Sequence, residues 1–240
     1  MRRTLLQLGA ELRIILRNGE QLLLTLIIPL ILLGFFGSVD VLPSGDEDPL
    51  TFLVPGVYAV AIMSSAMVSM GIATGFERSY LVLKRLGATP LTRMELVSAK
   101  VLSIFVVEIL QAIVLLSLGI ALGWRPQGNE WPLALLIVLL GTSAFGGVGL
   151  ILAGRLRAEI NLAAQNGLYL LLLLLGGMII PRDSLPGFLS NAALALPSTA
   201  LADGLRATLN GSGQLLQPIL ILLAWAVIAP LVAARRFRWS

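Results

Sequence analysis

The chain has 240 residues, of which 57% are hydrophobic and only 12% are charged, and its mean hydropathy is +0.92. Soluble domains carry about 25% charged residues, so this composition predicts a membrane protein. Because cysteine and histidine are absent, disulfides, thiol catalysis, the common zinc sites and histidine-dependent triads are excluded. The net charge of +4 does not indicate nucleic-acid binding, because the basic residues are sorted by membrane side, as shown below.

The segment ahead of the first apolar run, residues 4–20, predicts an amphipathic helix on the cytoplasmic membrane surface. Polar side chains, Glu11 among them, cover most of the helix surface outside one apolar stripe. The segment is read either as a simple membrane anchor or as an element that contacts a partner. The stripe has helical spacing and consists of Leu5, Leu8, Leu12, Ile15 and Leu16.

Six apolar runs follow, each of about the 20 residues that a spanning helix needs. The sequence therefore predicts an all-α membrane protein in which residues 1–240 form one transmembrane domain with six spanning helices. Short connections with Pro or Gly separate several of the runs. In chain order the runs are Leu22–Val39, Leu50–Phe76, Leu96–Trp124, Trp131–Ala153, Leu162–Ile180 and Leu215–Ala234.

The distribution of basic residues predicts that both chain ends lie in the cytoplasm. With six helices and the amino terminus inside, only three of the 17 Lys and Arg residues fall in outer segments: Arg125, Arg182 and Arg206. Basic residues accumulate on the cytoplasmic side of membrane proteins, so this orientation is favoured. An odd number of helices would place the basic tail, residues 235–238, outside.

The longest cytoplasmic connection runs from Glu77 to Lys100 and predicts a short helix, a stop and a second helix. We expect the short helix to stop at Gly87, which suits the position after a helix. The next helix can open at Thr89-Pro90, with proline in its first position. Thr92 and Glu95 also have the spacing of a capping box. The alternative is a solvated turn that carries basic residues only for topology.

Residues 181–213 form a long, semi-polar outer segment that is too interrupted to span the membrane. Pro181, Pro186, Pro197 and Gly204 divide it into short pieces. Broken helices at membrane depth are tolerated where protein or a water-filled cavity surrounds them. The segment therefore predicts either a short re-entrant helical pair or an ordinary loop on the outer surface.

Glu108 is the one acidic residue deep within a spanning run, about 15 Å from its inner end at 1.5 Å per residue. A charge at this depth normally faces the bundle interior. Gln111 lies one turn further on the same face, within reach of a shared hydrogen bond. Glu108 either holds helices together or lines a translocation path that favours cationic amphiphiles; the second hypothesis includes Gln111.

Two glycine pairs, Gly71 with Gly75 and Gly119 with Gly123, have the spacing that lets helices approach closely. The pairs predict close packing either within one subunit or between subunits.

Three stretches together resemble permeases of the type-2 family of ATP-binding-cassette (ABC) exporters. The first is the loop motif from Glu77-Arg78 through Leu83–Leu86 to Lys100. The second is the outer segment, with Gly176–Pro181, Leu185–Leu189, Leu196-Pro197 and Asp203–Arg206, and the third is the leading amphipathic helix. The resemblance covers nearly the whole chain and is strongest to the drug- and lipid-export branch.

The resemblance implies a transmembrane permease subunit of an ATP-driven exporter, in a bacterial inner membrane. The substrate would be an amphipathic or lipophilic drug-like or lipid-like molecule. Residues 77–90 would hold a coupling helix that docks on a separate ABC ATPase subunit, and the permease would form a homodimer or pair with a second permease. The residues carried over to ATPase coupling are Glu77, Arg78, Leu83, Lys84, Arg85, Thr89, Pro90 and Arg93.

The chain has no G-x-x-x-x-G-K-[ST] phosphate loop, so we expect it to be no enzyme and to bind neither cofactor nor metal, with ATP bound by the partner. Three alternatives stay open. The first is export of a lipid-linked glycan by the same family. The second is a secondary transporter or channel that uses Glu108, and the third is a membrane scaffold for an enzyme complex.

Overall fold

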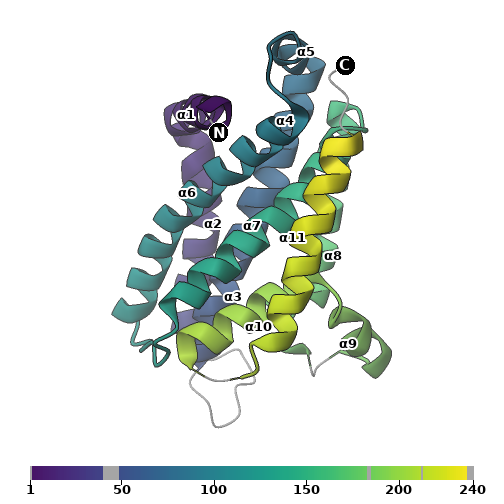
Figure 1. Ribbon diagram of the computed structural model, residues 1–240. Helices are drawn as coiled ribbons and strands as arrows, with labels where there is room; N and C mark the ends of the chain where they lie inside the picture. Colours follow the sequence, from purple (N-terminus) through teal and green to yellow (C-terminus); the bar gives the residue numbers. More distant parts are fainter. Residues whose placement is uncertain (1, 40–48, 183–184, 212, 237–240) are drawn as a thin grey trace.

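The computed structural model describes residues 2–39, 49–182, 185–211 and 213–236, and these parts of the chain are almost entirely helical (Figure 1). The predicted outer loop 40–49 and the last residues of the basic tail lie largely outside the described residues. The helices are α1 (Arg2–Arg17), α2 (Gly19–Ser38), α3 (Pro49–Met63), η1 (Ser64–Ser69), α4 (Met70–Ser79), α5 (Val82–Gly87), α6 (Arg93–Ala121), α7 (Trp131–Ala153), α8 (Ala158–Leu175), α9 (Gly187–Ala193), α10 (Pro197–Asn210) and α11 (Leu216–Arg236).

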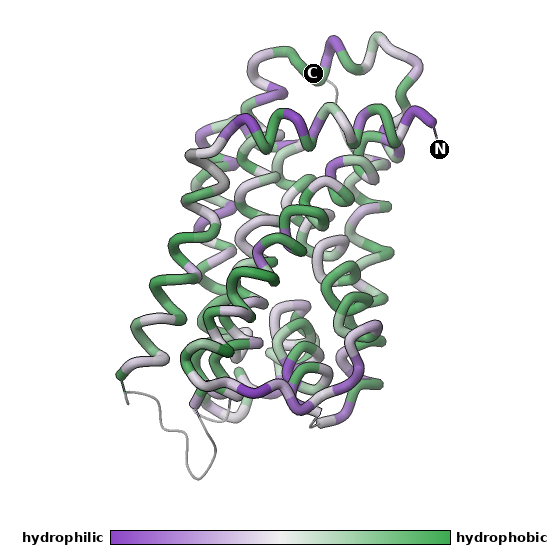
Figure 2. Tube along the Cα trace, turned by 90° about the vertical axis from the view of Figure 1, so that its left-hand side faces the viewer, coloured by the Kyte–Doolittle hydropathy of each residue, from purple (hydrophilic) through white to green (hydrophobic). Residues whose placement is uncertain are grey.

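Long apolar helices form a bundle whose two ends are polar, as the hydropathy colouring in Figure 2 shows. Within the described residues, five helical stretches are long and apolar enough to cross a membrane, and α2 adds a shorter apolar stretch, Thr25–Ser38. This arrangement confirms the predicted all-α membrane fold. The five longer stretches, with their bounds, are Pro49–Ser79, Arg93–Ala121, Trp131–Ala153, Ala158–Leu175 and Leu216–Arg235.

The short helices lie at opposite ends of the bundle (Figure 1). At one end, here named the α5 end, α1 lies across the bundle and α5 projects beyond it. At the other, named the α10 end, α9 and α10 lie between the end of α8 and the start of α11. Neither α9, with 7 residues, nor α10, with 14, is long enough to span a bilayer. The segment is therefore a helical pair, one of the two predicted forms.

Helix α7 is the centre of the bundle, because its glycines let neighbouring helices come close. A Cβ atom at Gly147 would lie 2.5 Å from the backbone nitrogen of Pro230 in α11. At Gly149 it would lie 2.6 Å from the carbonyl oxygen of Met67 in η1. Real Cβ atoms do not lie so close to backbone atoms of another helix, so these contacts need glycine. They fix the position of α7 against both neighbours.

The spanning stretch Pro49–Ser79 is not one regular α-helix. Residues Ser64–Ser69 form a π-helical turn, η1, between α3 and α4. π-turns are uncommon and occur mostly as single turns within α-helices. The π-turn was not predicted, because Leu50–Phe76 reads as one continuous apolar run.

The first glycine pair packs against side-chain amides rather than against another helix backbone. Asn161 and Gln165 of α8 lie over Gly75 and Gly71, where a Cβ would approach their nitrogens to 2.4 Å and 2.1 Å. The Asn161 amide donates to the Gly71 carbonyl oxygen at 2.9 Å, and the Gln165 amide to that of Gly149 at 2.9 Å. The pair thus serves packing within one subunit.

Replacement of Gly149 by alanine is expected to destabilise the fold by about 1–3 kcal/mol, because the added methyl group has no space beside the backbone of Met67. Thermal unfolding of the purified protein in detergent measures this. The matched control is Gly167→Ala, which has no atom within 4 Å of the new Cβ and is expected to leave the melting temperature unchanged or slightly raised. Equal melting temperatures for the two variants would contradict the close contact of α7 with η1.

Candidate functional site

The loop at the α5 end contains the predicted short helix, but its boundaries differ from those predicted. The chain breaks at Leu81, whose φ of 60° is left-handed, and α5 then ends with Gly87 inside the helix. The prediction that Gly87 is the stop after the helix was therefore wrong. The next helix does not open at Pro90: Thr92 caps α6 in a complete capping box with Glu95. Here the local pairing of two side chains prevailed over the proline signal.

The predicted coupling residues fall into two groups. Three face the bundle: Leu83 is fully buried, Glu77 pairs with Lys100, and Arg78 donates to the carbonyl oxygens of Ala153 and Leu156, both at 3.0 Å. Arg78 thereby covers the end of α7. The other five are exposed at the tip: Lys84, Arg85, Thr89, Pro90 and Arg93.

A small apolar cluster fixes α5 on the bundle. Leu83 of α5 and Leu96 of α6 are both fully buried, with Leu86 and Leu91 packed against them. The tip also presents apolar residues that the sequence analysis did not single out. Tyr80, Leu81 and Val82 are 71%, 52% and 39% exposed. The α5 end is therefore a supported surface with mixed apolar and basic character.

An ion cluster beneath this surface joins three helices. The Lys100 ammonium lies 3.1 Å from Oε2 of Glu11 in α1 and 2.8 Å from Oε2 of Glu77 in α4. The Lys100 side chain is 3% exposed and that of Glu11 is 8% exposed. Burial of charges without partners is costly, so this cluster needs all three groups in place. The sequence contained a signal for it, since Lys100 lies inside an apolar run.

Helix α1 forms as predicted, and its polar face makes one buried contact that the sequence did not indicate. Glu11 is the one buried residue of α1, whereas Leu5 and Leu16 of the apolar stripe are 64% and 57% exposed. The apolar stripe is thus turned partly away from the protein, as suits a helix on a membrane surface. Arg3 also donates to the Pro90 carbonyl oxygen at 2.7 Å, which links α1 to the loop.

The two polar residues predicted in the third span are buried and have separate partners. Glu108 is 0% exposed, and its Oε2 contacts the hydroxyl of Thr142 in α7, while its Oε1 has no hydrogen-bond partner among the described residues. The Gln111 amide donates to Ser65 Oγ at 3.0 Å and to the Thr25 carbonyl oxygen at 3.3 Å. No hydrogen bond between Glu108 and Gln111 is present among the described side chains.

Two cavities lie near these polar residues. A small one of about 60 Å³ extends from the ion cluster at Glu11, Glu77 and Lys100 to Thr25 and Ser65. A larger, open groove of about 350 Å³ runs between α2, η1, α4 and α8. Gln111 binds Thr25, which lines both cavities. The residues of the groove are Thr25, Ile28, Pro29, Ser64, Val68, Ser69, Ile72, Asn166 and Tyr169.

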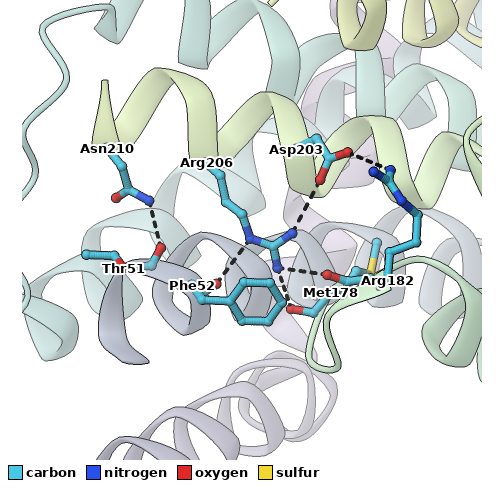
Figure 3. A network of polar contacts seen from close by, with 8 residues as sticks. Thr51, Phe52, Met178, Arg182, Asp203, Arg206 and Asn210 are labelled. Atoms are coloured by element: carbon cyan, nitrogen blue, oxygen red, sulfur yellow. Dashed lines mark hydrogen bonds and ion pairs between the residues drawn. The ribbon is translucent and has the colours of Figure 1, made fainter. Parts of the chain in front are cut away.

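At the α10 end, Arg206 joins three parts of the chain (Figure 3). Its guanidinium donates to the carbonyl oxygens of Gly177 at 2.8 Å, Met178 at 3.0 Å and Phe52 at 3.3 Å. It also lies 3.7 Å from the centre of the Phe52 ring and 3.4 Å from Oδ1 of Asp203. Burial lowers the pKa of Arg206 to about 10, so the group stays charged at neutral pH. Sequence analysis had counted Arg206 only as an outer basic residue.

Asn210 completes the attachment of α10. Its amide donates to the Thr51 carbonyl oxygen at 2.7 Å, and its oxygen accepts from the fully buried Trp124 at 3.2 Å. Helix α10 is thus fastened to α3 and to the end of α6.

Comparison with known proteins identifies the family. A model of the ABC-2 type transporter family matches residues 4–210, from α1 to the end of α10. The chain belongs to the ABC-2 type transporter family. A protein of Bacillus subtilis (strain 168) named "Putative transport permease YvfS" is 26% identical over 226 residues, which are 93% of this chain and 92% of that protein. The predicted family is confirmed.

Membership makes this chain a permease, the transport component of an ABC system. Family membership also implies association with an ABC ATPase. The roles assigned to the individual residues of the α5 end and to Glu108 and Gln111 stay predictions.

Replacement of Lys100 by methionine is expected to destabilise the protein by about 3–5 kcal/mol, because Glu11 and Glu77 are left close together without their cation. Thermal unfolding in detergent measures the loss. Combining Lys100→Met with Glu11→Gln and Glu77→Gln should restore part of it. The control, Lys84→Met at an exposed position of α5, should stay within about 0.5 kcal/mol of the parent. A Lys100→Met protein as stable as the parent would show that the ion cluster does not hold the three helices.

Proposed function

We propose that this chain is the transmembrane permease subunit of an ATP-driven exporter that moves amphipathic or lipophilic molecules out of the cytoplasm or the inner leaflet. The observation that carries the proposal is the supported α5 surface. A loop that served only to place basic residues in the cytoplasm would not need the buried Leu83, the capping box of Thr92 and the contact of Arg78 with the end of α7. Such a surface can pass a force from a partner to the bundle.

The path of this force runs through the charged residues at the base of α5. Glu77 and Arg78 lie at the end of α4, directly before α5, and contact α6 and the end of α7 respectively. Movement of α5 on ATP binding by the partner would therefore move α4, α6 and α7 together. The exposed predicted residues, such as Lys84 and Arg85, would contact the ATPase itself, with Tyr80 and Leu81 as apolar neighbours.

We further propose that two permease subunits meet at the face formed by α2 and α8. Of the five long apolar stretches in the described part of the chain, α8 is the least buried. It carries an exposed asparagine, Asn166, whose amide bonds only to the Leu162 carbonyl oxygen of its own helix among the described contacts. A polar side chain that faces lipid is costly, so a second subunit is expected to cover it. The groove lined by Asn166 and Tyr169 would then form half of a substrate path.

Gln111 contacts Thr25, which lines this groove, whereas Glu108 lies between α6 and α7, and we propose that both act when the bundle opens. In the closed bundle Glu108 is inaccessible between α6 and α7, so a substrate would reach it only after these helices separate. A carboxyl group exposed there would favour cationic amphiphiles. The α5 end would lie in the cytoplasm of a bacterial inner membrane, as the distribution of basic residues predicts.

Charge reversal at the tip, Arg85→Glu, is expected to abolish most co-purification with an ATPase that carries a phosphate loop, because the exposed cation would lose its partner. Affinity purification from native membranes in mild detergent, followed by mass spectrometry, measures this. The control is Arg13→Glu, an exposed charge on α1 at the same end of the bundle. Recovery of the chain without any ATPase, under conditions that preserve other membrane complexes, would overturn the proposed function.

Replacement of Glu108 by glutamine, which keeps the size of the side chain and the contact with Thr142, is expected to reduce export of cationic amphiphiles about tenfold and to spare neutral ones. Transport into inverted vesicles containing permease and ATPase measures both. The control is Glu130→Gln, an exposed acid outside the spans. Export of both substrate types at parental rates would refute the role of Glu108.

A further inference from the structure

A further cavity with a polar lining lies at the α10 end. None of the residues to which the proposed function assigns a role in transport lines it. It has a volume of about 390 Å³ and lies between α10, the start of α11 and the segment before α9. It contains charged side chains that the fold alone does not require to face a cavity. Its lining includes Arg182, Thr199, Asp203, Arg206, Gln214 and Gln217.

The charges of this cavity favour an anion. Among the described residues that line the cavity, Asp203 is the one acid, and it lies 3.3 Å from Arg182 and 3.4 Å from Arg206, so these lining residues carry one positive charge in excess. Arg206 is committed to carbonyl oxygens and is 15% exposed, whereas Arg182 is 29% exposed and contacts only Asp203 among the described residues. Arg182 is therefore the group with donors left for a ligand.

An unpartnered hydroxyl in the same wall is an independent sign of a ligand. Thr199 is 2% exposed, and its Oγ1 is buried without a hydrogen-bond partner among the described residues. Buried polar atoms nearly always have a partner, and Thr199 lines the cavity, so its hydroxyl has a donor left for a ligand there. The exposed amides of Gln214 and Gln217 add further donors at the rim.

The place of the cavity indicates that the anion belongs to a lipid. Pro218 and Ile221 line it and belong to the first turns of the spanning helix α11, which is where a bilayer has its headgroups. Leu194 and Ala200 make the remaining wall apolar. Exposed leucines on the same turns of α11, Leu216 and Leu220, continue the apolar surface. A phosphate with attached acyl chains fits this combination better than a free ion does.

We propose that this cavity binds the phosphate ester headgroup of an anionic membrane lipid, with Arg182 and Thr199 as its main donors. The excess positive charge disfavours the cationic amphiphiles that the Glu108 path is proposed to favour. The inference does not depend on ATP-driven export and concerns a lipid held at the α10 end.

Binding can be measured by native mass spectrometry of the full chain in a neutral detergent, titrated with phosphatidylglycerol, with diacylglycerol and with inorganic phosphate. Phosphatidylglycerol is expected to bind and diacylglycerol not. Arg182→Gln should weaken phosphatidylglycerol binding about tenfold, through loss of a charge-assisted hydrogen bond. Thr199→Val should weaken it a few-fold, and Arg125→Gln, an exposed arginine outside the cavity, should leave it unchanged.

The variant Asp203→Asn distinguishes binding of an anion from a purely structural role of the charged residues in the cavity. Removing the carboxylate raises the positive charge of the cavity, so phosphatidylglycerol should bind more tightly, whereas general damage to the site would weaken binding. If Arg182→Gln fails to fold, Asp203→Asn still tests whether the cavity binds the lipid phosphate.

Three results would overturn the proposal: unchanged binding in Arg182→Gln and Thr199→Val, an equal loss in Arg125→Gln, or weaker binding in Asp203→Asn. Binding of inorganic phosphate that depends on Arg182, without binding of phosphatidylglycerol, would overturn the lipid as the source of the anion.

Discussion

The absence of water in a bilayer imposes the constraint on which this fold depends: a backbone carbonyl group that loses its helical partner must find another within the protein. The chain meets this requirement with polar side chains from distant elements. Arg78 covers the end of α7, and Arg206 covers the end of α8 at Gly177 and Met178. Within a span, the Asn161 amide also donates to the Gly71 carbonyl oxygen. These polar side chains therefore form fixed contacts between helices.

Buried charge has a related effect at the α5 end. Lys100 belongs to a spanning helix, Glu77 precedes α5, and Glu11 belongs to the surface helix α1. Because none of the three can leave the cluster without exposing the others to a medium of low polarity, these elements are expected to move together. The membrane-surface helix is then part of the same mechanical unit as the α5 surface, which is proposed to contact the ATPase.

The elements that the sequence predicted well are those set by local patterns. Residues 131–153 form the fourth helix with the predicted bounds, and the capping box of Thr92 and Glu95 formed as its spacing indicated. The misplaced features depend on contacts between residues far apart in the chain. Glu11 is buried because Lys100, 89 positions away, needs a partner, and no helical wheel of residues 4–20 contains that information.

The same distinction applies to the sites. Glu108 was found because an acid within an apolar run is visible in the sequence, and its burial agrees with the cost of a charge there. Arg206 was missed because an arginine in an outer segment looks like any solvated charge. Its contacts with Phe52 and Met178 arise only when the helical pair folds back on α3 and α8.

The π-turn η1 also sets the rotational phase of everything that follows it in the second span. A π-turn holds more residues than an α-turn, so α3 and α4 do not share one helical wheel. If Ser64–Ser69 wound as an α-helix with no residue removed, α4 would turn by about 100° relative to α3, the angle between successive residues of an α-helix. Glu77 would then face away from Lys100, and Arg78 away from the end of α7. The direction in which α5 points is thus determined by the winding of one turn within the second span.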